Sequence, residues 1–236
     1  DFLKKSSMLG VSTIAPGVFF QELAHGRALD EPASSKIRWG MLINTNQCTD
    51  ECDACVTACN EEHGIEDFGR HTTDTQWIRK MTLTDELSKK SISVPMMCQH
   101  CENPPCVDVC PTGASFIRDD GIVLVNKHTC IGCRYCMMSC PYKARSFVHE
   151  NLENQLPHAP RGKGCVESCN LCVHKIDNGE NNTACAEACQ KDGHQAILFG
   201  DLNDEESDIS KQLKKYATKE VRSDLGLNTA VRYRGI

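Results

Sequence analysis

Seventeen cysteines are the residues of this 236-residue chain whose number and spacing point most clearly to chemistry. Cysteine at this density occurs in disulfide frameworks, zinc sites and iron–sulfur clusters, which differ in how their thiols are spaced. The spacing therefore decides between these uses. Four groups follow one another along the chain: Cys48, Cys52, Cys55 and Cys59; Cys98, Cys101, Cys106 and Cys110; Cys130, Cys133, Cys136 and Cys140; and Cys165, Cys169, Cys172, Cys185 and Cys189.

The third group has the spacing of a cubane iron–sulfur site. Its sequence, C-I-G-C-R-Y-C-M-M-S-C-P, is the C-x2-C-x2-C-x3-C-P run of bacterial ferredoxins. Three closely spaced thiolates bind one cluster in such a run and the fourth reaches a second cluster, so the clusters come in pairs. The second group, C-Q-H-C-E-N-P-P-C-V-D-V-C-P, has the same form with one longer gap. We therefore expect these two groups to hold a pair of clusters together.

The first and fourth groups are less regular forms of the same pattern. The first group has one extra residue in its first gap, and the fourth separates C-N-L-C from C-A-E-A-C by a longer segment. The four groups together predict an internal repeat of two ferredoxin-like units with four 4Fe-4S clusters. Sixteen cysteines suffice for four clusters, and Cys165 is the candidate for the remaining thiol. A role of Cys165 as a swapped or alternate ligand stays open, because its spacing to the next two cysteines repeats the start of the first group.

Other uses of cysteine fit this pattern less well. The cysteine count is odd, and the C-x2-C pairs are too close together for good disulfide bridges. A tetrahedral zinc site needs two pairs of ligands, whereas the third group offers a triple. No C-x2-C pair is followed by the histidine that covalent haem requires, and no glycine-rich nucleotide or flavin motif is present. A secreted cysteine-rich binding module is the alternative from another class of protein, and iron content and colour would distinguish it.

Composition excludes several further classes. The formal charge is −6, from 32 acidic and 26 basic residues, without a long block of like charges, so a nucleic-acid partner is not expected. The longest apolar stretch, residues 8–20, is short for a bilayer span, which excludes a multi-span membrane protein. The acidic pairs Asp119-Asp120 and Glu61-Glu62 are more typical of turns and solvated faces than of acid–base catalysis. We therefore predict that the chain is not itself an enzyme.

The elements that position the cysteines are expected to be short, in an α+β fold with long loops. Residues 115–118 and 122–125 flank an Asp-Gly turn and predict a β-hairpin between the second and third groups. Short helices are expected just before Cys59, Cys110, Cys140 and Cys189. Further strands are expected at residues 37–43, 76–84, 144–149 and 196–199, a connecting loop at 151–164, and an amphipathic helix at 208–219. The final V-R-Y-R-G-I is expected to lie along a partner or along the body of the chain.

The N-terminal segment predicts a location outside the cytoplasm. The chain begins D-F-L-K-K-S, followed by the weakly apolar residues 8–20, and this resembles a twin-arginine export signal without its two arginines. Export of a folded protein would let clusters be assembled in the reducing cytoplasm. We expect residues 1–30 to be a retained segment that lies in or against a membrane subunit on the periplasmic side. An ordinary start of a soluble protein is the alternative.

At these residues the sequence resembles the four-cluster iron–sulfur subunits of the complex iron–sulfur molybdoenzyme group, including the NrfC type and the polysulfide reductase type. The resemblance covers residues 37–204 and includes C-Q-H-C-E-N-P-P-C-V-D-V-C-P-T-G-A, C-I-G-C-R-Y-C-M-M-S-C-P-Y-K-A-R and C-N-L-C-V-H-K-I-D. The N-terminal segment, C-D-A-C-V-T-A-C-N-E-E-H-G and the V-R-Y-R-G tail are most similar to the periplasmic iron–sulfur subunits of Dsr-type membrane complexes associated with dissimilatory sulfite reduction.

This resemblance implies crossed ligation between paired groups. It assigns Cys48, Cys52, Cys55 and Cys189 to one cluster; Cys59, Cys169, Cys172 and Cys185 to a second; Cys98, Cys101, Cys106 and Cys140 to a third; and Cys110, Cys130, Cys133 and Cys136 to a fourth. Three departures from the family pattern are the extra residue after Cys48, Lys143 in place of a frequent glycine, and Gln190 in place of a frequent proline. Cys165 is an addition to the pattern.

The resemblance also implies the organisation of the chain. An outer ferredoxin-like unit is expected from residues 36–91 with 150–204, and an inner unit from residues 92–149. Residues 205–236 form a C-terminal extension. Positive side chains near the clusters are expected to offset part of their negative charge: Lys127, Arg134, Lys143, Arg145 and Lys175.

The function implied is electron transfer without bond chemistry in the chain itself. Four clusters would relay electrons between an NrfD-like integral membrane subunit that reacts with quinone and a periplasmic multihaem cytochrome c, with further subunits of the membrane complex. The alternative within the same family is an electron-transfer subunit beside a molybdopterin protein that reduces a sulfur oxyanion or polysulfide. Haem c without molybdenum in the purified complex would favour the first.

Overall fold

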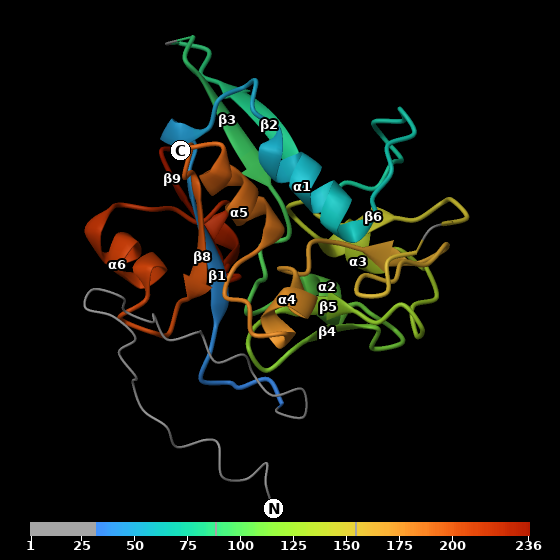
Figure 1. Ribbon diagram of the computed structural model, residues 1–236. Helices are drawn as coiled ribbons and strands as arrows, with labels where there is room; N and C mark the ends of the chain where they lie inside the picture. The colour runs from blue at the N-terminus through green and yellow to red at the C-terminus, as the bar shows by residue number, and fades with distance from the viewer. Residues whose placement is uncertain (1–31, 88, 154) are drawn as a thin grey trace, which may run out of the picture.

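The computed structural model describes residues 32–236 except residues 88 and 154, and combines short helices with four small sheets (Figure 1). The expected N-terminal signal and anchor at residues 1–30 lie outside the described residues. Within the described part of the chain, no helix is long and apolar enough to cross a membrane. The first helix or strand of the described chain is β1.

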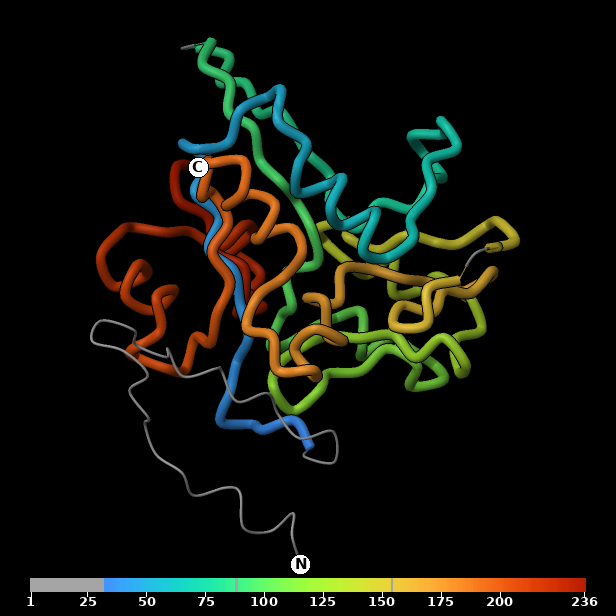
Figure 2. Tube along the Cα trace, viewed as in Figure 1, coloured from blue at the N-terminus to red at the C-terminus, as the bar shows by residue number. Residues whose placement is uncertain are grey.

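A three-stranded sheet ties the two ends of the described chain together. Its central strand, β1 (Trp39–Asn44), pairs antiparallel with β8 (Ile197–Asp201) and parallel with β9 (Val231–Arg234). Figure 2 shows the same arrangement as a blue segment between segments from the far end of the chain. The run Met41-Leu42-Ile43 is buried throughout, as expected for a central strand that is covered on both faces. The final segment thus lies along the body of its own chain, one of the two positions expected.

Helix α6 (Asp208–Lys215) packs against β8 and ends earlier than the amphipathic pattern predicted. Ser207 caps its N-terminus, because the Ser207 hydroxyl accepts a hydrogen bond from the Ser210 N–H at 3.2 Å. The chain leaves the helix at Tyr216 in an extended conformation and returns to the sheet, where Lys219 forms a β-bridge with Tyr233. A short 3-10 helix, η2 (Ser223–Leu225), precedes β9. The pairing with β9 therefore shortens the helix relative to its sequence pattern.

Helices α1 (Ala54–His63) and α5 (Ala184–Lys191) pack against each other although they lie far apart in the sequence (Figure 1). A 3-10 helix, η1 (Thr45–Gln47), leads from β1 toward α1. Helix α1 ends at Gly64, whose left-handed conformation (φ 60°) glycine adopts without strain. The hairpin of β2 (Arg79–Thr84) and β3 (Ser91–Met96) projects beyond these helices.

A second group of short elements follows β3. It contains the predicted hairpin, as β4 (Ser115–Ile117) paired with β5 (Val123–Val125). Strand β6 (Ser146–Phe147) pairs with β7 (Val166–Glu167). The helices here are short: α2 (Pro105–Asp108), α3 (Tyr135–Ser139) and α4 (Val173–Asp177).

The predicted strands and helices agree with the structure in position and differ in length. Helices α1 and α5 include Cys59 and Cys189 instead of ending before them, because their cysteines are spaced by one helical turn. The predicted strand at 144–149 is reduced to the two residues of β6. Four helices or strands were not predicted, namely β3, β7, β9 and α4, and neither were the two 3-10 helices. Of the strands, β9 pairs with a strand at the other end of the described chain, which local sequence does not reveal.

The close approach of β1 to its neighbours gives a test of this sheet. A Cβ at Gly40 would lie 2.5 Å from the backbone oxygen of Ala230, whereas one at its cross-strand partner Gly200 would first meet the side chain of Ile209 at 2.9 Å. We expect Gly40→Ala to destabilise the protein by about 1–3 kcal/mol, because a backbone carbonyl must move. Gly200→Ala is the matched control with a smaller expected loss. Thermal unfolding followed by circular dichroism compares the two, and equal losses would contradict the close approach at Gly40.

Candidate functional site

All seventeen cysteines lie in the described part of the chain, and none forms a disulfide. Twelve are buried, four are partly buried, and Cys133 alone is exposed. Eight of the buried ones belong to the main hydrophobic core together with apolar side chains such as Trp39 and Ile43. The structure therefore gives no support to a disulfide framework, and it places free thiols where a protein of this size would normally bury only apolar groups.

The first set of thiols, called site 1, surrounds a small cavity of about 20 Å³. Cys55 lies in α1 and Cys189 in α5. Cys48 and Cys52 lie in the loop before α1. Burial raises the pKa of Cys48 to about 11 and that of Cys55 to about 12, and repulsion by neighbouring cysteines adds to both shifts. Site 1 consists of Cys48, Cys52, Cys55 and Cys189.

Site 4 surrounds a similar small cavity of about 20 Å³, formed by cysteines of the second and third groups. Cys136 lies in α3, and Cys110 follows α2. The Ser115 N–H donates a hydrogen bond to Cys110 Sγ at 3.4 Å. Although burial acts to raise the pKa of Cys110, this and other hydrogen bonds lower it overall. Site 4 consists of Cys110, Cys130, Cys133 and Cys136.

The remaining eight predicted ligands form two more sets, which are the most deeply buried. Burial and then the neighbouring thiols of Cys169, Cys185 and Cys172 raise the pKa of Cys59 well above its usual value. Burial and then Cys98, Cys106 and Cys140 raise the pKa of Cys101 to about 12. Site 2 therefore consists of Cys59, Cys169, Cys172 and Cys185, and site 3 of Cys98, Cys101, Cys106 and Cys140.

The structure thus brings together the four sets that the family resemblance implies. Which sulfur atoms bind iron remains a prediction. The chemistry of the sets fits that prediction, because thiols with such raised pKa values stay protonated at neutral pH unless a metal replaces the proton.

The four sites follow one another in a row. Helix α1 carries Cys55 of site 1 and, one turn later, Cys59 of site 2. Helix α5 carries Cys185 of site 2 and Cys189 of site 1 in the reverse order. The α1–α5 contact therefore holds sites 1 and 2 at adjacent turns of one helix pair.

Sites 3 and 4 are joined in the same way, by the two shorter helices α2 and α3. Cys106 of site 3 lies in α2, just before Cys110 of site 4, and α3 carries Cys136 of site 4 just before Cys140 of site 3. Helices α2 and α3 contact each other. Cys98 of site 3 lies close enough to Cys169 of site 2 to raise the pKa of its thiol. The order along the row is therefore site 1, site 2, site 3, site 4.

Local backbone conformation turns the cysteine loops inward. Several non-glycine residues with positive φ lie within or beside the cysteine groups: His100 (42°), Arg134 (64°), Leu171 (54°) and Cys172 (50°). Such left-handed residues point successive N–H groups toward one side of the chain and form anion-binding concavities. The Ala196 N–H donates to Cys189 Sγ at 3.2 Å, and the Thr183 hydroxyl lies 3.3 Å from Cys185 Sγ. These donors suit thiolate sulfur.

Among the predicted cations, two lie at the sites. Arg145 is buried and lines the site 4 cavity, and Arg134 lines the same cavity with its guanidinium 4.1 Å from the centre of the Phe147 ring. Lys80, which was not predicted, lines site 1 and donates to the backbone oxygens of Asp50 and Cys52. Lys80 could not be predicted from the sequence, because it lies far from any cysteine along the chain. The β2–β3 hairpin brings Lys80 to site 1.

The three predicted lysines have other partners. Lys143 is exposed and donates to the backbone oxygen of Met138 at 3.4 Å. Lys127 pairs with Glu167 at 3.6 Å. Lys175 pairs with glutamates at 2.9 and 3.0 Å, although its charge still acts to lower the pKa of Cys172. The sequence therefore overestimated the number of cations directed at the sites.

Cys165 lies beside site 4, away from its own sequence group. It is buried, and its Sγ donates to the Lys127 carbonyl oxygen at 3.2 Å. Burial raises the pKa of its thiol, and the neighbouring Cys130 raises it further. An alternate-ligand role would therefore concern site 4.

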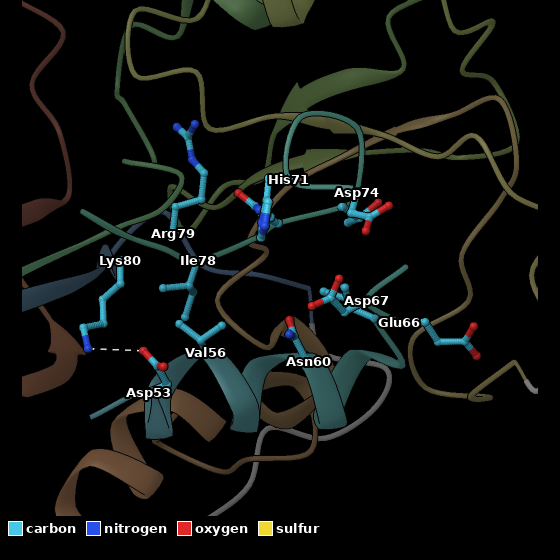
Figure 3. A pocket seen from close by; sticks show the side chains of 13 residues that line it. Asp53, Val56, Asn60, Glu66, Asp67, His71, Asp74, Ile78, Arg79 and Lys80 are labelled. Carbon is cyan, nitrogen blue, oxygen red and sulfur yellow. Dashed lines mark hydrogen bonds and ion pairs between the residues drawn. The ribbon is translucent and has the colours of Figure 1, made fainter. Parts of the chain in front are cut away.

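A polar pocket of about 250 Å³ lies beside α1 (Figure 3). None of its lining residues is a cysteine. Asp53 pairs with Lys80 at 3.2 Å at one end of it, and the Asp74 carboxylate at the other end accepts hydrogen bonds from the Phe68 and Arg70 N–H groups. These two carboxylates thus have partners within the protein.

Comparisons with known proteins agree with the chemistry of the sites. Residues 90–201 match the family model described as a 4Fe-4S dicluster domain. The Hdr-like menaquinol oxidoreductase iron-sulfur subunit 1 of Archaeoglobus fulgidus is 41% identical over 230 residues, covering 86% of this chain and 85% of that protein. A polysulfide reductase polypeptide of Wolinella succinogenes is 37% identical, covering 80% and 90%. A tetrathionate reductase polypeptide of Salmonella typhimurium is 31% identical, covering 100% and 89%.

The position of Cys165 gives a test. We expect Cys165→Ser to leave the iron content of the purified protein unchanged, because a serine hydroxyl can make the same hydrogen bond to the Lys127 carbonyl. Cys130→Ser, which alters the adjacent member of site 4, is the matched variant and is expected to lower the iron content. Iron assay of the two proteins measures this. An equal loss of iron from both would show that Cys165 is itself a ligand.

Proposed function

This chain belongs to the family of iron–sulfur subunits with a 4Fe-4S dicluster domain, and we propose that it relays electrons through four 4Fe-4S clusters held at sites 1 to 4. The row of four sets of four thiols is the observation that carries this proposal. A 4Fe-4S cluster supplies one-electron redox chemistry at each site. The chain is an electron-transfer subunit, and catalysis belongs to other subunits of its complex.

The protein's contribution at each site is position and charge. Four thiolates per site need the positive charge of iron, because burial alone keeps thiols such as Cys55 and Cys101 protonated. Hydrogen bonds to sulfur, such as that from Ala196 to Cys189, help set the reduction potential. We assign all sixteen cysteines of sites 1 to 4 as ligands and leave Cys165 as the spare thiol.

The row has two ends at which electrons can enter or leave. Site 4 contains Cys133, the one exposed cysteine, and is surrounded by exposed apolar side chains. Ile131 is 67%, Tyr135 53% and Met138 64% exposed. Apolar surface of this kind is typical of an interaction site. We therefore propose that the integral membrane subunit of NrfD type docks at site 4, and that electrons pass between it and the row there.

The finer identity of the complex is proposed on the sequence resemblance. The N-terminal segment and the V-R-Y-R-G tail favour a Dsr-type complex on the periplasmic side, with a multihaem cytochrome c at the other end of the row. The division into an outer unit (36–91 with 150–204) and an inner unit (92–149) is part of this proposal. It is supported by the two helix pairs, α1–α5 for sites 1 and 2 and α2–α3 for sites 3 and 4.

A second candidate places the same chain beside a molybdopterin subunit. The names of the polysulfide and tetrathionate reductase relatives favour this reading, since both are sulfur-compound reductases. Metal and haem analysis of the intact complex separates the two candidates. Haem c without molybdenum supports the first, and molybdenum supports the second.

A ligand substitution tests the cluster assignment. The full-length protein is expected to contain about sixteen iron atoms from four cubane clusters. Cys98→Ser removes one proposed ligand of site 3, so we expect a partial loss of iron and a change in one of the four sets of EPR signals. The other three sets should persist. A wild-type protein that contains zinc and no iron would refute the proposed function.

Charged substitutions test the docking surface. We expect Ile131→Glu and Met138→Glu to reduce co-purification of the membrane subunit at least tenfold, because each places a carboxylate on the apolar surface beside Cys133. Leu87→Glu is the matched control, since Leu87 is 94% exposed in the β2–β3 connection, away from site 4. Pull-down from detergent-solubilised membranes measures this. Retention of the membrane subunit by both site 4 variants would exclude this surface.

A further inference from the structure

Arg145 differs from the other cations of the molecule in its burial. Arg145 is the one described lysine or arginine that is buried as a whole residue, with 5% of its surface exposed. The side chain of Arg161 is also only 5% exposed, but it pairs with Glu167. Arg145 directly precedes β6, five residues after Cys140 of site 3. One guanidinium nitrogen, Nη2, donates to the buried Ser115 hydroxyl at 2.8 Å, and Ser115 lies five residues after Cys110 of site 4. Arg145 thus lies where the segments that follow two different sites meet.

The guanidinium faces sulfur atoms of both sites. It lines the site 4 cavity, and its side chain lies within hydrogen-bonding reach of Cys106 of site 3 and Cys136 of site 4. Its charge also acts on Cys98 of site 3. Each of these thiols has a raised pKa because of burial, and the charge of Arg145 opposes the rise. One cation therefore acts on two sites.

The guanidinium lacks the usual partners of a buried charge. No carboxylate of the described residues forms an ion pair with Arg145, and its second terminal nitrogen, Nη1, is buried without a hydrogen-bond partner. The two buried carboxylates of the described residues are occupied, since Asp120 pairs with Arg118 and Glu167 with Arg161, both at 2.6 Å. A buried N–H donor on a cation requires an acceptor. The anionic sulfur of bound clusters is the acceptor that its position offers.

We propose that Arg145 is a shared positioning residue whose single charge stabilises the reduced state of the clusters at sites 3 and 4 together and so raises both reduction potentials. This inference rests on the proposed function. In a transfer from site 3 to site 4, the first cluster loses one electron and the second gains it, and Arg145 exchanges neither electron nor proton. Because both sites share the cation, its charge shifts the two potentials in the same direction.

The other half of the row has no equivalent group among the described residues. Lys80 at site 1 is paired with Asp53 at 3.2 Å, and Lys175 near site 2 is paired with Glu180 and Glu187. Neither lysine is buried like Arg145. The effect of removing the Arg145 charge should therefore be confined to two of the four clusters.

An EPR-monitored redox titration of the full-length protein with its clusters tests this. Arg145→Gln removes the charge but keeps a donor that can reach Ser115. We expect two of the four midpoint potentials to shift to more negative values together, while the other two stay unchanged. Arg145→Lys keeps the charge and is expected to restore most of the shift. A merely structural role for Arg145 would not produce a paired shift that the lysine variant rescues.

The control is Lys143→Gln, which removes an exposed charge two residues away and should shift no potential. An unchanged titration of Arg145→Gln, or a shift of only one cluster or of all four, would overturn the proposal. Should Arg145→Gln fail to assemble its clusters, Ser115→Asp is titrated instead, since it places a carboxylate against Nη2 and offsets the Arg145 charge. The same two potentials should then become more negative together, and no paired shift would overturn the proposal. Fewer than four clusters in the wild-type protein would instead refute the proposed function.

Discussion

The packing of sixteen thiols into four sets inside the protein is the constraint on which the rest of this structure depends. Burial, and after it repulsion from neighbouring cysteines, opposes ionisation of Cys55 in site 1, Cys59 in site 2 and Cys101 in site 3. Iron relieves this repulsion, because it supplies positive charge inside the set. The cysteines occupy core positions that apolar side chains fill in other proteins. This explains how a chain with such short strands and helices can still have a defined interior.

The spacing of the cysteines on short helices turns four separate sets into a row. On α1 and α5, two cysteines one turn apart belong to different sets, so each helix spans the boundary between two sites. The same crossing occurs at α2 and α3. Neighbouring sites are thus held at a fixed separation by backbone geometry. This is the arrangement that an electron relay requires, because side-chain motion cannot lengthen the path.

The sequence was sufficient to predict the features that depend on local pattern. The hairpin at the Asp-Gly turn is confirmed as β4 and β5, and the predicted strand at 37–43 is confirmed as β1. Features that depend on how the folded elements lie against one another were out of reach. The β2–β3 hairpin brings Lys80 to site 1, far from the cysteines that form this site in the sequence. For the same reason the sequence could not separate Arg145 from four other cations, since burial between two sites is a property of the folded chain.

The interleaving of the cysteine groups has a consequence for how the protein matures. Sites 3 and 4 draw their thiols from one continuous stretch, residues 98–140, which leaves the ribosome as a unit. Site 1 joins Cys48 to Cys189, and β1 beside it is completed only by β9 at the far end of the described chain. Synthesis of the chain therefore completes the thiol sets of sites 3 and 4 before those of sites 1 and 2, which need cysteines from the later segments.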